Sequence, residues 1–346
     1  MHICHVNLSK GFRGGERQTG LLIRELAARG FTQALVCRAT SPLREHLADV
    51  DNLRFHTANS PLGGHRLGRR GVDLLHAHDG RAVHWCLLEN ALGGAPYLIT
   101  RRVPNPLKTR ASTRLAYRRS SCVVALSRAI ETGLHAYDPA LTTRVIPSMC
   151  AHLDHDPEAA AAIRQRYPGK FLVGHIGALV NKHKGQRHLI EAARQLAPRC
   201  PELHFLFLGQ GRDEAMLKAE AEGLDNVEFL GFKSNVGDYL AALDLFAFPS
   251  LEEGLGSVLF DVMEYRVPIV ASRVDGIPDI VEHQANGLLV PPADASALAE
   301  AIETLYRDPD YARHLAAEGA RRLPAYSPSA IADRYTALYR ELTENR

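Results

Sequence analysis

The sequence lacks long apolar stretches. None of its 346 residues belongs to an apolar run of about 18 residues, the length that a membrane-spanning helix requires. No basic leader with an apolar core and a cleavage site precedes the first strand-like segment, Ile3 to Leu8. Low-complexity tracts and repeats of fixed period are also missing. These absences argue against a membrane-spanning protein, a fibre and a disordered chain. We expect a cytoplasmic protein whose membrane contact, if it has any, is peripheral.

Cysteine and histidine show no patterned spacing. The cysteines are scattered through apolar stretches, which predicts reduced thiols in a core rather than a disulfide framework or a zinc site; they are Cys4, Cys37, Cys86, Cys122, Cys150 and Cys200. Among 17 histidines the closest pair is His76 and His78, and a spacing of two on a strand end only weakly indicates a metal. We therefore predict neither a bound metal nor a cofactor.

Charge is unevenly divided along the chain. Residues 1–150 carry 21 Lys and Arg against 10 Asp and Glu, a net +11, whereas residues 151–346 carry 20 against 29, a net −9. The densest basic stretch comprises Arg101, Arg102, Lys108, Arg110, Arg114, Arg118 and Arg119. It favours an anionic partner, either a phosphorylated acceptor or an anionic membrane surface; the alternative is a solvated helix face. Nucleic acid is not expected, because neither aromatic interleaving nor a recognised module supports it.

The length and the order of apolar segments favour two domains. A chain of 346 residues is too long for one ordinary core and suits two domains of about 150 to 200 residues. Short apolar segments alternate with helical ones in both halves, which is typical of parallel sheets with crossover helices. We predict an α/β protein with two doubly wound domains, 1–150 and 169–325, joined by a linker, 151–168. An amphipathic helix within 326–346 is expected to pack back on the first domain.

The expected strands place the functional site. Those of the first domain are Ile3 to Leu8, Ala34 to Cys37, Leu74 to His76, Tyr97 to Thr100, Cys122 to Leu126 and Val145 to Ile146. Those of the second domain are Phe171 to Ile176, His204 to Leu208, Val227 to Leu230, Leu245 to Phe248 and Ile269 to Ala271. Ligands of open parallel sheets bind beyond the carboxyl ends of the strands. Two such domains facing each other therefore predict a site in a central cleft.

The segment 249–264 carries the strongest functional pattern. It follows an apolar strand and opens a helix, and Gly254 and Gly256 remove side chains where a backbone can approach a ligand. The N–H groups at a helix start attract phosphate. Glu253 and Asp261 stand in otherwise apolar sequence, and carboxylates accept hydrogen bonds from the vicinal hydroxyls of a ribose or hexose. The alternative is that Asp261 only complements the helix N-terminus or lies on an exposed stripe.

Two further segments combine glycine with charge after an expected strand. Gly174 to Leu179 precedes Lys184, whose ammonium is a candidate for neutralising phosphate; a surface lysine is the alternative. Gly14 and Gly15 stand between the first strand and the first helix, with Glu16 near the helix N-terminus. A tight turn without a ligand is the alternative for this loop.

The segment 249–264 resembles the signature of the retaining family 4 glycosyltransferases of group 1, whose fold is the two-domain GT-B architecture. The resemblance implies that Glu253 contacts the donor sugar and that Asp261 contacts the nucleotide ribose. The second acid of the family is Glu, so the shorter Asp261 implies a longer or water-mediated contact. The donor-binding residues that the resemblance implies in this segment are Glu253, Gly254, Leu255, Gly256 and Asp261.

The resemblance extends to the phosphate-binding loop. Lys184 matches the lysine that the family uses for the donor diphosphate, whereas Ala178 stands where an Arg is expected. Lys182, Arg187 or an Arg of the first domain is a candidate replacement for that cation. The backbone near Phe232 corresponds to the part of the family that reads the base.

In the first domain the resemblance implies that Gly14 and Gly15 adjoin the donor phosphates. Arg101 and Arg102 occupy the neighbourhood in which many family members carry a catalytic His, so no such His is assigned. The residues expected at the acceptor are Glu16, His78, Arg101 and Arg102. The residues expected to act in the reaction are Glu253, Lys184 and Arg102.

The implied activity is transfer of a sugar from a nucleoside diphosphate sugar to an acceptor hydroxyl, with retention at the anomeric carbon and without a metal. The basic first half favours an anionic glycan or glycolipid acceptor, as in the synthesis of lipopolysaccharide core or lipid-linked saccharides at the inner face of a bacterial membrane. Two alternatives remain, a non-hydrolysing nucleotide-sugar epimerase and a catalytically degenerate module that binds sugar nucleotides. A nicotinamide dehydrogenase is disfavoured because no Gly-x-Gly-x-x-Gly follows the first strand.

Overall fold

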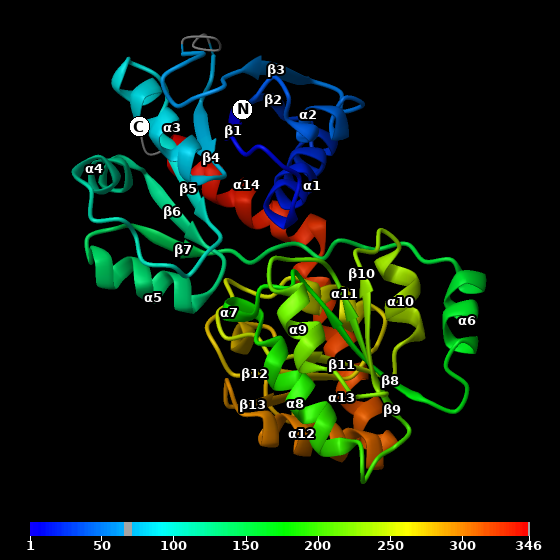
Figure 1. The fold of residues 1–346 in the computed structure, drawn as a ribbon. Helices are drawn as coiled ribbons and strands as arrows, with labels where there is room; N and C mark the ends of the chain where they lie inside the picture. Colours follow the sequence, from blue (N-terminus) through cyan, green and yellow to red (C-terminus); the bar gives the residue numbers. More distant parts are fainter. Residues whose placement is uncertain (66–70, 345–346) are drawn as a thin grey trace. The chain divides into compact units, whose positions relative to one another are not determined.

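The computed structural model describes residues 1–65 and 71–344, and the chain forms two compact units (Figure 1). The first unit comprises Met1–Met149 and Ala325–Arg346, and the second comprises Cys150–Pro324. The last segment of the sequence therefore belongs to the same unit as the first segment.

The first unit is built on a parallel sheet. Its described strands are β1 (His2–Asn7), β2 (Thr32–Cys37), β3 (Leu53–Thr57), β4 (Leu74–Ala77), β5 (Tyr97–Arg101), β6 (Cys122–Ala125) and β7 (Thr143–Val145). Their order in the sheet is β3-β2-β1-β4-β5-β6-β7, and each of these pairs is parallel. The chain runs outward from β1 to β3 and then outward in the other direction from β4 to β7. The carboxyl ends of β1 and β4 therefore flank the switch point at which such sheets bind ligands.

Helices from both ends of the chain complete this unit. Those described are α1 (Gly14–Ala28), α2 (Pro42–His46), α3 (Gly80–Ala91), α4 (Ala111–Arg119), α5 (Arg128–Tyr137) and α14 (Pro328–Glu344). Helices α1 and α14 lie against each other and share an apolar core with Ile3, Leu74 and Leu98 of the sheet (Figure 1). Arg29 at the end of α1 donates to Ser329 Oγ at 2.8 Å. The segment 326–346 thus supplies a core helix of the first unit, and residues 345–346 lie outside the described residues.

The second unit repeats the plan with a smaller parallel sheet. Its strands are β8 (Phe171–Ile176), β9 (Leu203–Leu208), β10 (Val227–Gly231), β11 (Leu245–Phe248), β12 (Ile269–Ser272) and β13 (Leu288–Val290). They stand in the order β10-β9-β8-β11-β12-β13, which puts the switch point between β8 and β11. The helices are α6 (Pro157–Gln165), α7 (Asn181–Lys184), α8 (Gln186–Leu196), α9 (Glu214–Glu220), α10 (Val236–Ala242), α11 (Val258–Glu264), α12 (Ala295–Arg307) and α13 (Pro309–Arg322). The prediction of two doubly wound Rossmann-like domains is confirmed.

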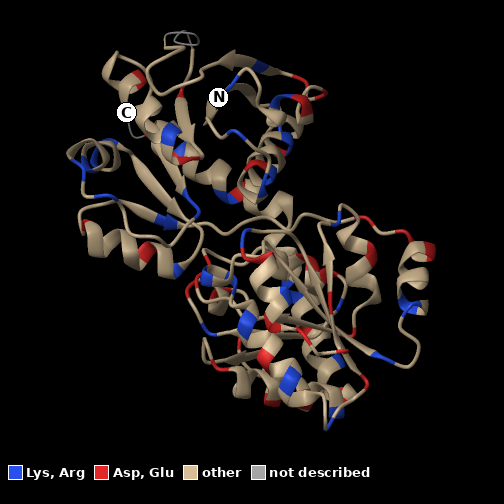
Figure 2. Cartoon of the chain, viewed as in Figure 1, with Lys and Arg blue, Asp and Glu red and all other residues tan. Residues whose placement is uncertain are grey.

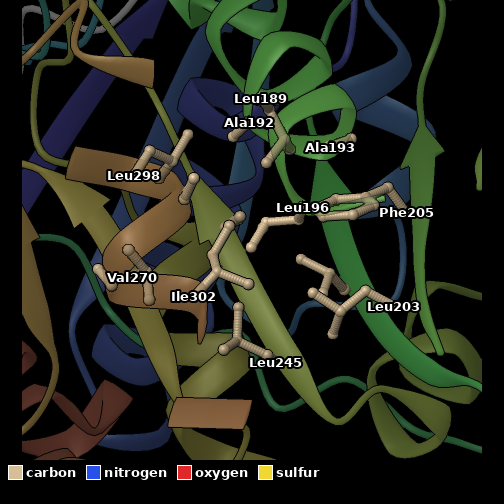
Figure 3. Packing of buried hydrophobic residues seen from close by; sticks show 14 of the residues in the cluster. Leu189, Ala192, Ala193, Leu196, Leu203, Phe205, Leu245, Val270, Leu298 and Ile302 are labelled. Carbon is tan, nitrogen blue, oxygen red and sulfur yellow. The ribbon is translucent and has the colours of Figure 1, made fainter. Parts of the chain in front are cut away.

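Helices α8 and α12 cover one face of this sheet (Figure 3). Helix α8 turns Leu189, Ala192, Ala193 and Leu196 inward, a spacing of three and four residues that places them on one side of the helix. They meet Ile302 of α12 together with apolar side chains of β9, β11 and β12. This packing holds the amino end of α8, and the short helix α7 before it, beside the carboxyl ends of the strands.

The segment 151–168 does not form a free linker. It carries α6, whose N-cap Asp156 accepts a hydrogen bond from the Glu158 N–H at 2.9 Å, and the Asp156 N–H donates to Asp238 on α10 at 2.7 Å. Ala160 and Ile163 are buried where α6 packs on α10. The segment is therefore part of the second unit, because its short Ala-rich helix has an apolar face to bury.

Two edge strands escaped the sequence prediction. Both β3 and β13 stand at the end of a sheet, where a strand has a neighbour on one side only. No residue of β3 is fully buried, and β13 has three residues. Segments this polar or this short carry little periodicity, so their pattern does not distinguish a strand from a loop.

The structure bears on two absences seen in the sequence. All six cysteines are free and buried, as the prediction of reduced core thiols requires. Over the described residues, no helix combines the length and the apolar character needed to cross a membrane.

Two leucines test the packing of the second unit against an exposed reference. Leu196 is fully buried and Leu62 is 82% exposed, so Leu196→Ala and Leu62→Ala make one chemical change at opposite extremes of burial. We expect Leu196→Ala to lower the free energy of unfolding by about 2–5 kcal/mol, because the lost methyl groups leave a cavity. Leu62→Ala should change it by less than about 0.5 kcal/mol. Urea unfolding followed by circular dichroism measures both, and equal midpoints for the two variants would contradict the described core.

Candidate functional site

The loop after β11 and the helix α7 are joined through their backbones. The His183 carbonyl accepts hydrogen bonds from the N–H groups of Leu251 at 2.8 Å and Glu252 at 3.1 Å. Gly185, which ends α7, has a φ of 63°, and a Cβ there would lie 2.1 Å from the Pro249 carbonyl oxygen. Only glycine allows this approach. Two segments about 70 residues apart in sequence are therefore held edge to edge at the carboxyl ends of β8 and β11.

This junction pairs two consecutive residues of α7 with two consecutive acids of the loop. Lys184 Nζ forms an ion pair with Glu253 Oε2, and His183 Nδ1 lies 2.7 Å from Glu252 Oε2. The Lys184 ammonium also stands 5.1 Å from the centroid of the Phe248 ring. The side chains of Lys184 and Glu253 are 23% and 16% exposed. The structure thus brings together the predicted phosphate-binding lysine and sugar-binding glutamate as a partly desolvated pair.

A third loop orients Glu253. Its N–H donates to Asp275 Oδ2 at 2.9 Å, and its carbonyl accepts from the Gly276 N–H at 3.3 Å. Asp275 has a φ of 45°, a conformation that Asp tolerates better than most residues. Asp275, Phe248 and His183 were not expected at the site from the sequence. For Asp275 the Asp-Gly dipeptide, typical of a turn, is the signal that was present.

The loop after β8 lies against the loop after β9. The Gly177 N–H donates to Leu208 O at 3.0 Å, and the Leu179 N–H donates to Gln210 O at 3.1 Å. Gly209 has a φ of 138°, and a Cβ there would come within 1.9 Å of the Gly177 carbonyl oxygen. The backbone around exposed Ala178 is thereby fixed on both sides.

The candidates for the cation missing at Ala178 differ in their surroundings. Arg187 Nε is paired with Glu220 at 2.8 Å, so its charge is already neutralised. Lys182 is exposed on α7, and it has no hydrogen-bond or ion-pair partner in the described parts of the chain. Of the two neighbours, Lys182 is the one that remains available.

A neutral histidine supports the loop after β8 from below. His175 is fully buried, its Nδ1 donates to Ala247 O at 3.1 Å, and Gln186 Nε2 donates to the Ala178 carbonyl at 2.9 Å and lies 3.4 Å from His175 Nε2. Burial lowers the pKa of His175 to about 4, with the charge of Lys184 acting in the same direction and the bond to Ala247 against it. An uncharged support of this kind leaves Lys184 as the cation that faces the site.

The other residues predicted for the donor are placed differently. Gly254, Leu255 and Gly256 are buried. Asp261 is buried on α11, which removes the alternative of an exposed stripe. Phe232, just after β10, is 70% exposed.

The first unit contains a cavity of about 610 Å³ at the carboxyl ends of β4 and β5. All four residues predicted for the acceptor line it, and so does Gly15: Gly15, Glu16, His78, Arg101 and Arg102. Gly14 begins α1 beside them. A Cβ on Gly15 would lie 3.5 Å from Arg102 Cδ, so the half-buried Arg102 side chain lies over bare backbone. Burial lowers the pKa of Arg102.

Two of these residues are already engaged within the protein. Glu16 Oε2 accepts a hydrogen bond from the Arg13 N–H at 2.9 Å, which caps the start of α1. Arg101 donates to Tyr117 Oη at 3.3 Å and to the Asn105 carbonyl. Glu16 therefore has a structural role at the helix N-terminus where the sequence places it, and Arg101 presents only part of its guanidinium to the cavity.

Three buried histidines stand behind the same cavity. His5, His76 and His78 bring nitrogen atoms within 4.8 Å of one another, the one group among the described residues that is close enough to share a metal ion. His76 Nδ1 lies 2.7 Å from Tyr339 Oη on α14, and its Nε2 lies 2.7 Å from Thr100 Oγ1. Burial lowers the pKa of His5 to about 4 and those of His76 and His78 well below their usual range. The cluster is neutral and ties α14 to the sheet.

A second cavity of about 730 Å³ adjoins the first and shares Lys10, Asp79 and Arg101 with it. Lys and Arg predominate among the charged residues of its lining, which are Lys10, Arg81, Arg101, Lys108 and Arg110 against Asp79. Figure 2 shows Lys and Arg gathered on α4 and the segment before it. The predicted basic stretch is not uniform, however, because Arg118 is paired with Asp138 at 2.5 Å, whereas exposed Lys108 and Arg110 border the cavity.

Comparison with known proteins agrees with this geometry. A family model described as Glycosyltransferase Family 4 matches residues 12–149, and one described as Glycosyl transferases group 1 matches residues 170–308. The chain is 36% identical over 202 residues to the alpha-D-kanosaminyltransferase of Streptomyces kanamyceticus, a match that covers 55% of this chain and 51% of that protein. It is 30% identical over 272 residues, 69% of each chain, to the 2-deoxystreptamine glucosyltransferase of the same organism. The lipopolysaccharide core biosynthesis glycosyltransferase LpsE of Rhizobium meliloti is 28% identical over 362 aligned positions, 98% of each chain.

Solved structures match the fold over its full length. HepE of Anabaena, solved in complex with UDP, has a TM-score of 0.84 at 22% identity and covers 99% of this chain and 100% of its own. Sucrose-phosphate synthase of Thermosynechococcus elongatus has a TM-score of 0.81 at 23% identity and covers 100% of each chain. The fold of these proteins is GT-B, with two Rossmann-like sheets of the kind described above. The two family models and the match to the 2-deoxystreptamine glucosyltransferase show that the chain belongs to glycosyltransferase family 4, group 1 type.

Proposed function

We propose that the chain is a retaining, metal-independent hexosyltransferase that moves a sugar from a nucleoside diphosphate sugar to an acceptor hydroxyl. The family and the structural neighbours that bind UDP or UDP-glucose support the donor class. The observation that carries the proposal is the pairing of Lys184 with Glu253 at the carboxyl ends of β8 and β11.

This pair suits a ligand with a diphosphate at one end and a diol at the other. In the proposed donor complex the ammonium of Lys184 binds a phosphate oxygen, and the carboxylate of Glu253 accepts hydrogen bonds from the sugar hydroxyls. Each group then exchanges its partner for one on the donor. As the glycosidic bond breaks, negative charge grows on the diphosphate. Because the Lys184 ammonium is already in position, it stabilises this charge without having to reorganise. Asp261, on the helix α11 that follows the Glu253 loop, is the proposed contact of the ribose.

The acceptor proposal rests on the first unit. Lys10, Arg81, Lys108 and Arg110 line a cavity in which Asp79 is the acidic side chain, and Asp79 already caps α3 by accepting from the Arg81 and Ala82 N–H groups. A surplus of fixed positive charge favours an anionic acceptor, a phosphorylated glycan or a glycolipid. The full-length similarity to LpsE supports a place in the synthesis of bacterial envelope glycans. We propose that the enzyme works in the cytoplasm, at the inner face of an anionic membrane.

The first prediction concerns donor binding. Lys184→Ala and Glu253→Gln should each weaken binding of the donor by about 10- to 100-fold. The first removes a charged donor to the phosphate, and the second replaces a charged acceptor of the sugar hydroxyls by a weaker, neutral one. Lys218→Ala is the matched control, since Lys218 pairs with Glu214 on the surface of the same unit and should change nothing. Thermal shift with UDP-, GDP- and ADP-sugars identifies the donor, and calorimetry measures the affinity.

The same screen separates the alternatives. If none of the nucleotide sugars stabilises the protein, the proposal is refuted. If a nucleotide sugar binds but is neither transferred nor hydrolysed, a degenerate binding module is favoured. An epimerised nucleotide sugar recovered without an acceptor would favour an epimerase. Lys182→Ala asks separately whether the exposed Lys182 replaces the cation absent at Ala178; it should weaken donor binding several-fold if it does.

The second prediction concerns the acceptor. Charge reversal by Lys108→Glu and Arg110→Glu should raise KM for the acceptor by about tenfold or more and leave donor affinity unchanged. The reason is that side chains that attract an anionic acceptor are replaced by side chains that repel it. The effect should shrink as salt is added. Arg54→Glu is the control, since Arg54 is exposed on the edge strand β3 of the same unit. Steady-state kinetics with a lipopolysaccharide-core acceptor, and sedimentation with anionic vesicles, measure both aspects. Indifference of acceptor use and vesicle binding to these reversals would rule out an anionic partner.

A further inference from the structure

The histidine cluster of the first unit has a defined order of donors and acceptors. Gln33 on β2 donates from Nε2 to the carbonyl of Ile23 at 2.9 Å, so its Oε1 faces His5 Nε2 at 3.0 Å. An amide oxygen only accepts hydrogen bonds, and the proton of His5 is therefore on Nε2. Because burial keeps His5 neutral, its Nδ1 carries a lone pair and no hydrogen.

This order continues to His78. Its Nε2 lies 3.0 Å from His5 Nδ1, and since the His5 atom can only accept, His78 Nε2 must donate. Burial keeps His78 neutral as well, and a neutral imidazole has a single N–H. The remaining nitrogen of His78, Nδ1, therefore presents a lone pair. The amide of Gln33 sets this tautomer through two hydrogen bonds.

The lone pair of His78 lacks a partner among the residues that the structure describes. His78 is only 4% exposed and lines the cavity of about 610 Å³. The Nε atom of Arg102, which lines the same cavity, also has no hydrogen-bond partner there. Buried polar atoms are normally satisfied, and here one is an acceptor and the other an N–H donor.

We propose that His78 Nδ1 and Arg102 Nε bind one hydroxyl group of a sugar substrate in this cavity. The hydroxyl donates its hydrogen to His78 and accepts the Arg102 N–H, so a single group satisfies both atoms. A carboxylate has no hydrogen for His78, and an ammonium has no lone pair for Arg102. The proposal rests on the proposed function and deepens it, because it assigns a neutral recognition point beside the basic cavity that takes the anionic part of the acceptor.

The same residues make a metal site less suitable. A metal bound to His5 Nδ1 or His78 Nε2 would break the hydrogen bond between them. Both nitrogens of His76 are already engaged by Thr100 and Tyr339. The hydroxyl, by contrast, uses every atom of the cluster as it stands.

Nitrogen-15 NMR of the histidines tests the proposal without relying on activity. We expect the full-length protein to show a proton on Nε2 of His78 and none on Nδ1. Glucose 6-phosphate, which has both hydroxyls and an anionic group, should shift the Nδ1 resonance of His78 and leave that of His175 in the second unit unchanged. A shift with UDP-glucose alone would assign the hydroxyl to the donor, and a shift with glucose 6-phosphate would assign it to the acceptor.

Two substitutions at one position separate binding from folding. His78→Gln retains an amide that can reach His5 but offers no acceptor at the δ position, whereas His78→Asn places an amide oxygen there. We expect His78→Gln to weaken glucose 6-phosphate binding, measured by calorimetry, by about tenfold, and His78→Asn to restore most of the affinity. Gln33→Met tests the relay, because without the amide oxygen His78 should populate both tautomers.

Three results would overturn the proposal: a proton on His78 Nδ1, an Nδ1 resonance that neither sugar moves, or equal binding by the Gln and Asn variants. Zinc-dependent shifts of all three histidines, reversed by a chelator, would replace it with a metal site. Failure of the proposed function gives a different pattern, in which no nucleotide sugar stabilises the protein even though the tautomer of His78 is as described.

Discussion

The backbone contact between α7 and the loop after β11 is the constraint on which the proposed donor site depends. The His183 carbonyl accepts two N–H groups of that loop, and Gly185 lets the chains approach to a distance that no side chain would permit. Once these segments are fixed, the side chains of Lys184 and Glu253 lie next to each other and form an ion pair. Their partly desolvated charges would be costly alone, and together they stay in place for a ligand with complementary ends.

In the first unit, hydrogen bonds stabilise polar side chains that are buried on the strands of the sheet. The three clustered histidines, His5, His76 and His78, are neutral because they are buried, and each has a partner on another strand or on α14. Tyr335 Oη lies 3.2 Å from Thr100 Oγ1, so two tyrosines of α14 reach the same network. Helix α14 thus supports the residues behind the cavity of about 610 Å³.

Much of the fold and part of the site were predictable from the sequence. Alternating apolar and helical segments gave the two sheets, and the residues expected at the acceptor line one cavity. The junction between α7 and the loop of Glu253 was beyond reach, because it depends on backbone contacts between distant segments that carry no periodicity. The same is true of Asp275, whose role is set by a bond to another loop. Roles of this kind arise from three-dimensional proximity, whereas periodicity reports only local structure.

The placement of α14 has a consequence for folding during synthesis. The core of the first unit contains Ile331, Tyr335 and Tyr339, which the ribosome makes after all of the second unit. During synthesis, residues 1–149 therefore have an incomplete core until α14 is made. The second unit is one uninterrupted segment, so its core is complete before α14 is synthesised. The usual order, in which the N-terminal domain folds first, is reversed for the final packing step. The apolar face of α1 and the sheet that α14 covers therefore stays uncovered in the nascent chain until the last residues are made.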